Sequence, residues 1–280
     1  MEPVMLLQSH KSKTIYSLVV ELAAADTGKI PATLSRAIHG LVMNWLQLGN
    51  SQIAEEVHAM QESPLSLSGL LGNRRPKGAQ AGDNFFFRVC LLDEGLLEPL
   101  FAGIEKWGTQ SLILGQFMFV IRNVYTLPGT HHLARSADYK LLANTPLTTT
   151  DVELNFISPT SFKQRQNIQV FPLPELVFGN LLRRWNAFAP EEFNFPVVAW
   201  EGLVSAYELK THALKLEGGS EIGSQGWVRY RFPISEQAKL ATVLAHFAFF
   251  SGVGRKTSMG MGQTQFVSVG LRRDSFPKRK

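Results

Sequence analysis

The densest group of residues able to do chemistry is a glycine-rich segment near the C-terminus, residues 252–262. It reads Gly-Val-Gly-Arg-Lys-Thr-Ser-Met-Gly-Met-Gly. Glycine accepts positive φ angles and lets the backbone approach a ligand closely, while adjacent cations neutralise negative charge. The segment therefore predicts a loop that binds a polyanion. Its predicted binding residues are Gly252, Gly254, Arg255, Lys256, Gly260 and Gly262.

Two known phosphate-binding motifs do not fit this segment. A P-loop needs Gly-x-x-x-x-Gly-Lys-Ser/Thr between a strand and a helix, and here the lysine is in the wrong place. A dinucleotide-binding fingerprint needs a third glycine, and its helix follows the loop, whereas here the apolar helix-like run precedes it. For this segment taken alone, a turn that only connects two elements is the alternative interpretation.

Two histidines lie on the polar faces of predicted helices. In the helix expected over residues 32–48, Arg36 and His39 are three residues apart and share the face opposite the apolar stripe. In the helix expected over residues 51–60, His58 also points away from the apolar stripe. An imidazole titrates near neutral pH and can act as a general base or acid. A surface histidine without a role is the alternative for each one alone.

A histidine base, nearby cations and a polyanion-binding loop fit metal-free cleavage of RNA. The base takes the proton from a ribose 2′-hydroxyl, which attacks its own neighbouring phosphate, and cations stabilise the charge that develops there. Neither histidine has a second ligand at the i+4 position of its own helical face, which disfavours a metal site. We expect no metal and no cofactor.

Further basic residues occur in predicted loops and on one predicted helix, where they could follow an RNA backbone. A solvated surface charge is the alternative for each. The predicted RNA contacts outside the glycine-rich segment are Lys163, Arg165, Arg183, Arg184, Arg74, Arg75 and Lys77.

The composition is that of a globular protein whose second half is basic. The chain has 280 residues, of which 45% are apolar, so it can bury a sizeable core. Residues 1–130 hold 10 Lys and Arg against 11 Asp and Glu, whereas residues 131–280 hold 18 against 12. The single cysteine, Cys90, allows no internal disulfide and fits a reducing, cytoplasmic location. No apolar window is long enough to predict a secretion signal or a membrane span.

The predicted elements follow the order βαββαβ twice. Each such unit folds as a four-stranded antiparallel sheet with two helices on one face, the ferredoxin-like arrangement. We therefore predict an α+β fold of two tandem ferredoxin-like domains, residues 1–127 and 128–280. Strands are expected over residues 14–23, 65–71, 84–92 and 112–125, and then over 152–157, 198–216, 227–232 and 263–271. The remaining helices are expected over residues 93–106, 173–188 and 235–250, the last with Ser235 as its N-cap.

Together these residues resemble the CRISPR-associated repeat-RNA processing endoribonucleases, which belong to the repeat-associated mysterious protein (RAMP) superfamily. The resemblance is carried by Ile38-His39-Gly40-Leu41, the stretch 53–58, Ser158-Pro159-Thr160 and the glycine-rich segment. It implies two ferredoxin-like domains that cut precursor CRISPR RNA within each repeat, without metal, leaving a 2′,3′-cyclic phosphate and a 5′-hydroxyl. It also implies CRISPR repeat RNA as a partner, with other CRISPR-associated proteins and a homodimer as further possible partners.

The resemblance assigns the catalytic residues as well. His58 matches the histidine that many members place in their second helix, and His39 is the second candidate, with Arg36 as a phosphate contact. Members with a Tyr-His-Lys trio differ, because this chain has Met43 at the tyrosine position and no lysine between His58 and residue 72. Either the two histidines form the acid-base pair, or the protein is a non-catalytic RNA-binding subunit of an interference complex. A small-molecule enzyme that binds a nucleotide on the glycine loop is a more distant alternative.

Overall fold

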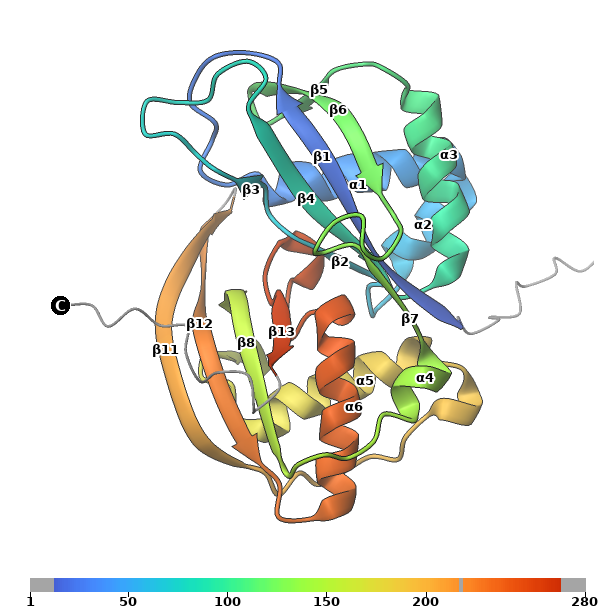
Figure 1. Ribbon diagram of the computed structural model, residues 1–280, viewed down its shortest axis with the longest axis vertical. Helices are drawn as coiled ribbons and strands as arrows, with labels where there is room; N and C mark the ends of the chain where they lie inside the picture. Colours follow the sequence, from blue (N-terminus) through green and yellow to red (C-terminus); the bar gives the residue numbers. More distant parts are fainter. Residues whose placement is uncertain (1–12, 217–218, 268–280) are drawn as a thin grey trace, which may run out of the picture.

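The computed structural model describes residues 13–216 and 219–267, which form two α+β halves stacked along the long axis of the molecule (Figure 1). Each half contains an antiparallel sheet and its own apolar core, one built from residues 18–124 and the other mainly from residues 137–266. The prediction of two tandem ferredoxin-like domains is confirmed. The predicted boundary between residues 127 and 128 stays a prediction.

The first half orders its sheet as β2-β4-β1-β6-β5, with β3 also paired to β4 and β7 paired to β1. In strand β1, Leu18, Val20 and Leu22 pack into the core of this half. Most of the opposite face of β1, including Ser17 and Val19, is buried as well. The strands are β1 (Thr14–Ala24), β2 (Leu65–Leu67), β3 (Leu71–Gly72), β4 (Asn84–Leu91), β5 (Leu112–Leu114), β6 (Phe117–Tyr125) and β7 (Arg135–Asp138). The helices are α1 (Ser35–Gly49), α2 (Ser51–Ala59), the short η1 (Glu94–Leu96) and α3 (Leu97–Trp107).

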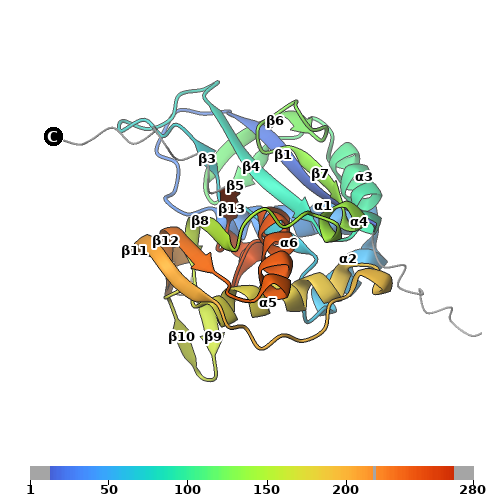
Figure 2. The same ribbon diagram turned by 60° about the horizontal axis from the view of Figure 1, so that its bottom comes forward.

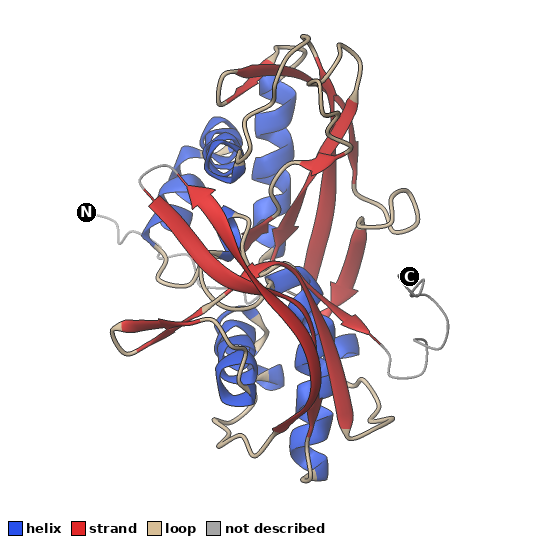
Figure 3. Ribbon diagram, turned by 90° about the vertical axis from the view of Figure 1, so that its left-hand side faces the viewer, coloured by secondary structure: helices blue, strands red, loops and turns tan. Residues whose placement is uncertain are grey.

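The second half orders its sheet as β11-β12-β8-β13, and a separate hairpin of β9 and β10 projects beside α5 (Figure 2). The long hairpin of β11 and β12 reaches toward the first half (Figure 3). The strands are β8 (Asp151–Thr160), β9 (Phe162–Gln164), β10 (Asn167–Gln169), β11 (Leu203–Leu216), β12 (Gly219–Arg231) and β13 (Thr264–Val267). The helices are α4 (Tyr139–Ala143), α5 (Pro174–Phe188), η2 (Glu191–Phe193), α6 (Ser235–Ser251) and η3 (Thr257–Met259).

Several local predictions differ from the structure. The strand expected over residues 227–232 begins at Gly219, as β12, and the strand expected over residues 198–216 begins at Leu203, as β11. The single strand expected over residues 112–125 is a hairpin, because Gly115 adopts a φ of +65° and turns the chain between β5 and β6. The strand expected over residues 65–71 is broken into β2 and β3. Helix α6 has Ile234, not Ser235, at its N-cap and no side-chain cap hydrogen bond. Of the last predicted strand, residues 268–271 lie outside the described residues.

The two halves meet through helix α6 and a buried polar contact. Helix α6 packs on its own sheet and also against β1, β2 and β4 of the first half. Beside it, Nε of the buried Arg88 on β4 donates to Oε1 of Gln263 at 3.0 Å. The amide of Gln263 then donates to Ser66 Oγ and Leu67 O of β2, at 3.1 and 3.0 Å. Buried polar groups need such partners, so this contact fixes how the halves sit together.

None of the described helices is both long and apolar enough to cross a membrane. The cytoplasmic location stays a prediction.

Replacing Gln263 by alanine removes an acceptor of the buried Arg88 guanidinium. Because a buried charged donor without its acceptor is costly, we expect Gln263→Ala to lower the free energy of unfolding by about 2 kcal/mol in urea titrations. The matched control is Gln265→Ala, two residues along and exposed, for which we expect a loss of about 0.5 kcal/mol or less. Equal losses in the two variants would contradict this account of the contact between the halves.

Candidate functional site

The glycine-rich segment leaves the end of α6, forms η3 and returns into β13, between the two halves of the molecule. Its glycines are required by close backbone packing. At Gly262, with a φ of +70°, a Cβ would lie 2.1 Å from the carbonyl oxygen of Val253. At Gly254, with a φ of +85°, a Cβ would lie 2.4 Å from the carbonyl oxygen of Ser161. No side chain larger than hydrogen fits at either position.

The other two glycines of the segment pack against the first half. A Cβ at Gly260 would lie 2.5 Å from Oγ of Ser35, at the start of α1. A Cβ at Gly252 would lie 3.1 Å from Oγ of Ser66 on β2. The segment therefore joins the halves, a structural role that the sequence analysis did not assign to it.

His39 lies on α1 beside this segment. Its neighbours Ile38 and Val42 point into the core, which places the imidazole at the edge of the helix that faces η3. The ring makes a backbone hydrogen bond with Ser258 of η3. Its Nδ1 atom is buried and has no hydrogen-bond partner within residues 13–216 and 219–267. In this position Nδ1 is shielded from solvent and does not itself face a ligand.

Burial lowers the pKa of His39 below its usual value of 6.5. The hydrogen bond with Ser258 raises that pKa, and the nearby charges of His58 and Arg36 lower it further. The net direction is downward, so the imidazole is neutral at pH 7. A neutral imidazole is the form that acts as a general base.

His58 is brought to the same place by the short helix α2. The Asn50 side chain caps that helix by accepting from the backbone N–H groups of Gln52 and Ile53, at 3.1 and 3.2 Å. Ala54 and Val57 are buried, which leaves His58 exposed on the opposite side. His58 and Arg36 are therefore both near enough to His39 to affect the pKa of its imidazole.

Arg184, which the sequence predicted to contact RNA, is buried in the structure. It is only 3% exposed, because its guanidinium is used inside the protein. It donates from Nη1 to Thr257 Oγ1 of η3 at 2.5 Å and from Nη2 to the carbonyl oxygen of Ser63 at 3.0 Å. Burial lowers its pKa to about 10, so it stays charged at pH 7. Arg184 fastens η3 to the segment that follows α2, and so helps to hold the two histidines in place.

The two cations of the glycine-rich segment are paired with a carboxylate. Arg255 and Lys256 both form ion pairs with Glu221 on β12. Lys256 hydrogen-bonds to Glu221 and, together with Arg255, holds the pKa of that carboxyl below its usual value. The pair therefore presents one net positive charge to a ligand.

The remaining predicted RNA contacts fall into two groups. Lys163 and Arg183 line one pocket with Arg255, and Arg165 lies at the nearby turn between β9 and β10. Arg74 and Arg75 line a different pocket, on the loop between β3 and β4 that also carries Lys77. There Arg74 donates to the carbonyl oxygen of Pro31 at 2.8 Å, and Arg75 pairs with Asp83 at 2.8 Å. Neither pocket includes His39 or His58 among its lining residues.

Sequence reasoning missed several residues of this region. Asn180, whose Oδ1 accepts the N–H of Gly254 at 2.8 Å, carries no charge and belongs to no motif. A signal was present, since Leu176, Asn180 and Arg183 recur at the spacing of one helical face. Glu221 and Gln263 had no signal, because only the fold brings them to the segment. In the described part of the chain, no three His, Cys, Asp or Glu side chains gather where they could hold a metal ion.

Comparison with protein families matches residues 154–264 to the family of the CRISPR-associated endoribonuclease Cas6. The CRISPR-associated endoribonuclease Cas6 of Mycobacterium tuberculosis is 28% identical over 130 residues. That match covers 45% of this chain and 41% of the relative, so it spans less than half of the curated protein.

Two solved structures match almost the whole fold. A Cas6 product complex, of a protein from Thermus thermophilus, is 25% identical with a TM-score of 0.77, covering 91% of this chain and 100% of the other. A second Cas6 product complex is 29% identical with a TM-score of 0.72, at the same coverage. The resemblance drawn from the sequence is confirmed.

Proposed function

This chain is a relative of the Cas6 endoribonucleases, and we propose that it is a metal-independent endoribonuclease that cuts precursor CRISPR RNA within its repeats. The observation that carries the proposal is the His39 imidazole, whose pKa is lowered by burial and, in smaller part, by the nearby His58 and Arg36. A non-catalytic RNA-binding subunit has no need of a neutral imidazole held beside a second histidine and a cation.

In this mechanism His39 accepts the proton of the ribose 2′-hydroxyl, and the 2′-oxygen attacks the adjacent phosphorus. The bond between phosphorus and the 5′-oxygen breaks, and His58 gives a proton to that oxygen. Arg36 stabilises the additional negative charge on the phosphate oxygens. The products are a 2′,3′-cyclic phosphate and a 5′-hydroxyl, and the displacement uses no external nucleophile.

The environments of the two histidines support this division of roles. His39 is kept neutral by burial and by two neighbouring charges, which suits the base. His58 is exposed at the end of α2, where solvent can return its proton after each turnover. The predicted homodimer and the predicted contacts with other CRISPR-associated proteins stay predictions.

Removing either histidine should slow RNA cleavage without removing RNA binding. We expect His39→Ala and His58→Ala each to lower the single-turnover rate on the host's CRISPR repeat RNA, in EDTA, by about a hundredfold or more. His212→Ala is the control, because that histidine is exposed on β11 in the second half. If the wild type binds the repeat tightly in EDTA and never cuts it, the protein is a binding subunit and the proposal is wrong.

The pH dependence of cleavage should report the lowered pKa of His39. The rate falls when His39 gains a proton, so the acid limb of the pH profile should lie below pH 6.5. Because Arg36 contributes to lowering that pKa, Arg36→Gln should move the acid limb to higher pH while also reducing the maximal rate. An acid limb above pH 6.5 that does not move in Arg36→Gln would show that His39 is not the base.

A further inference from the structure

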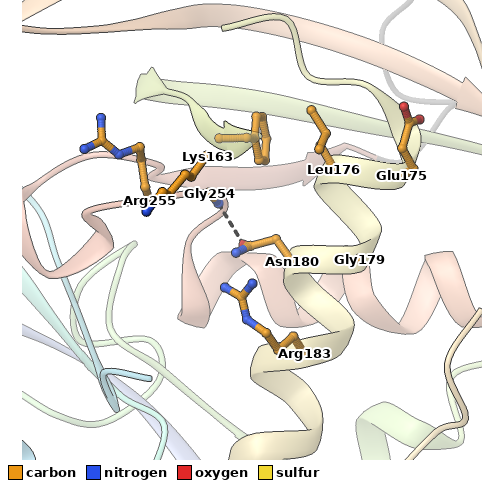
Figure 4. Close-up of a pocket in the computed structure, with 9 residues that line it drawn as sticks. Lys163, Glu175, Leu176, Gly179, Asn180, Arg183, Gly254 and Arg255 are labelled. Atoms are coloured by element: carbon orange, nitrogen blue, oxygen red, sulfur yellow. Dashed lines mark hydrogen bonds between the residues drawn. The ribbon is translucent and has the colours of Figure 1, made fainter. Parts of the chain in front are cut away.

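A pocket of about 260 Å³ lies between α5, the β9 strand and the glycine-rich segment (Figure 4). Its charged walls are Lys163, Arg183 and Arg255, which come from three elements far apart in the sequence. Arg183 and Arg255 each use one nitrogen on a carboxylate, Glu62 at 2.6 Å and Glu221, which orients their remaining N–H groups. The pocket is separate from the histidines.

The hydrogen-bond donors of this pocket lie at one end, and its carboxylate acceptor lies at the other. The cationic side chains lie near the side-chain amide of Asn180. The oxygen of that amide accepts a hydrogen bond from the N–H of Gly254, so its NH₂ group can donate to a ligand. The one carboxylate in the lining, Glu175, lies in the first turn of α5, nearer the start of the helix than Asn180. One end therefore offers donors to an anion, and the other end offers an acceptor to a hydroxyl or amino group.

Between these ends the lining residues are apolar. Leu176 and the buried Phe162 form one side, and Gly179 leaves open space, because a Cβ there would meet no atom within 4 Å. The volume lies just below the range of roughly 300–1,000 Å³ typical of drug-sized ligand sites. The cationic end, the apolar middle and the carboxylate end of the pocket match the phosphate, sugar and base of one nucleotide. A base-paired duplex does not enter the pocket.

The pocket is close to the proposed cleavage site along the chain. Arg255 is three residues from Ser258, whose backbone is hydrogen-bonded to His39. Three residues span at most about 11 Å when fully extended. An RNA strand lying against His39 can therefore reach the pocket within a few nucleotides.

We propose that this pocket holds a single unpaired nucleotide of the bound RNA, a few positions from the cleaved linkage. Its phosphate contacts Lys163, Arg183 and Arg255, its base lies over Gly179 and Leu176, and Glu175 accepts from its sugar or base. This inference rests on the proposed function, because it takes the bound polymer to be the RNA that the histidines cut. It assigns a specificity site outside the catalytic residues.

The test is an abasic scan of the host's CRISPR repeat RNA. Each nucleotide in turn is replaced by an abasic ribose, and the Kd is measured with the wild type, with Gly179→Leu and with the control Ala187→Leu. Gly179→Leu fills the pocket from an open helical position, and Ala187→Leu adds a larger side chain at an exposed position of the same helix outside it. We expect one position at which base removal weakens wild-type and Ala187→Leu binding about tenfold. That penalty should vanish in Gly179→Leu, which should bind unmodified RNA about tenfold more weakly.

A second readout tests the phosphate end of the pocket. Lys163→Gln should reduce the slope of log Kd against log salt by about one, because one phosphate contact is lost. A scan in which no position responds to Gly179→Leu would overturn the proposal, as would an unchanged salt slope in Lys163→Gln. Stabilisation of the wild type by free nucleoside monophosphates, lost in Gly179→Leu and without any responsive RNA position, would assign the pocket to a free nucleotide instead.

The two proposals can fail separately. Wild-type cleavage of the unmodified repeat in EDTA is measured in parallel with binding. If the RNA is cleaved but no position responds in the scan, only the proposal of a nucleotide pocket is wrong. If one position responds but the RNA is not cleaved, only the proposal of a nuclease is wrong.

Discussion

The arrangement depends on one constraint, which is that the glycine-rich segment is held between the two halves by buried charged groups. Arg184 reaches Thr257 from α5, and Arg88 reaches Gln263 from β4. Both arginines are 3% exposed, so each must keep its hydrogen-bond acceptors. The first contact joins η3 to α5, and the second joins Gln263, the residue that follows the segment, to β4. These contacts therefore also determine the positions of the residues that touch η3.

The His39 imidazole is the clearest consequence. His39 belongs to the first half, but the backbone group that hydrogen-bonds to it, at Ser258, belongs to the second. The site is therefore complete only when the halves are correctly placed, and burial between them lowers the pKa of the imidazole. The same contact places Arg255 and the pocket beside α5 within a few residues of the His39 imidazole. Glu221 balances part of the positive charge of Arg255 and Lys256, and the two ion pairs orient these side chains.

Sequence reasoning predicted most of the fold, because the information for it is local. The core-facing residues of β1 and the amphipathic helices α1 and α2 can be read from adjacent residues, and the same reading placed His58 on an exposed face. His39, expected opposite the apolar stripe, is instead partly buried beside η3. It could not show that Arg183 is exposed whereas Arg184 is buried. Neighbouring residues on a helix point about 100° apart, and only the fold shows which of the two is buried. Ion pairs such as Arg255 with Glu221 join residues 34 apart, which no spacing rule connects.

The central claim is that a ribose 2′-hydroxyl, activated by His39, is the nucleophile. The most direct measurement uses a repeat RNA in which only the nucleotide before the cleaved linkage carries 2′-deoxyribose. Its binding and its single-turnover cleavage are then compared with those of the all-ribose RNA in EDTA. The account predicts unchanged binding and no cleavage of the deoxy substrate, with a 2′,3′-cyclic phosphate on the product of the ribose substrate. Cleavage of the deoxy substrate at the normal rate would contradict it.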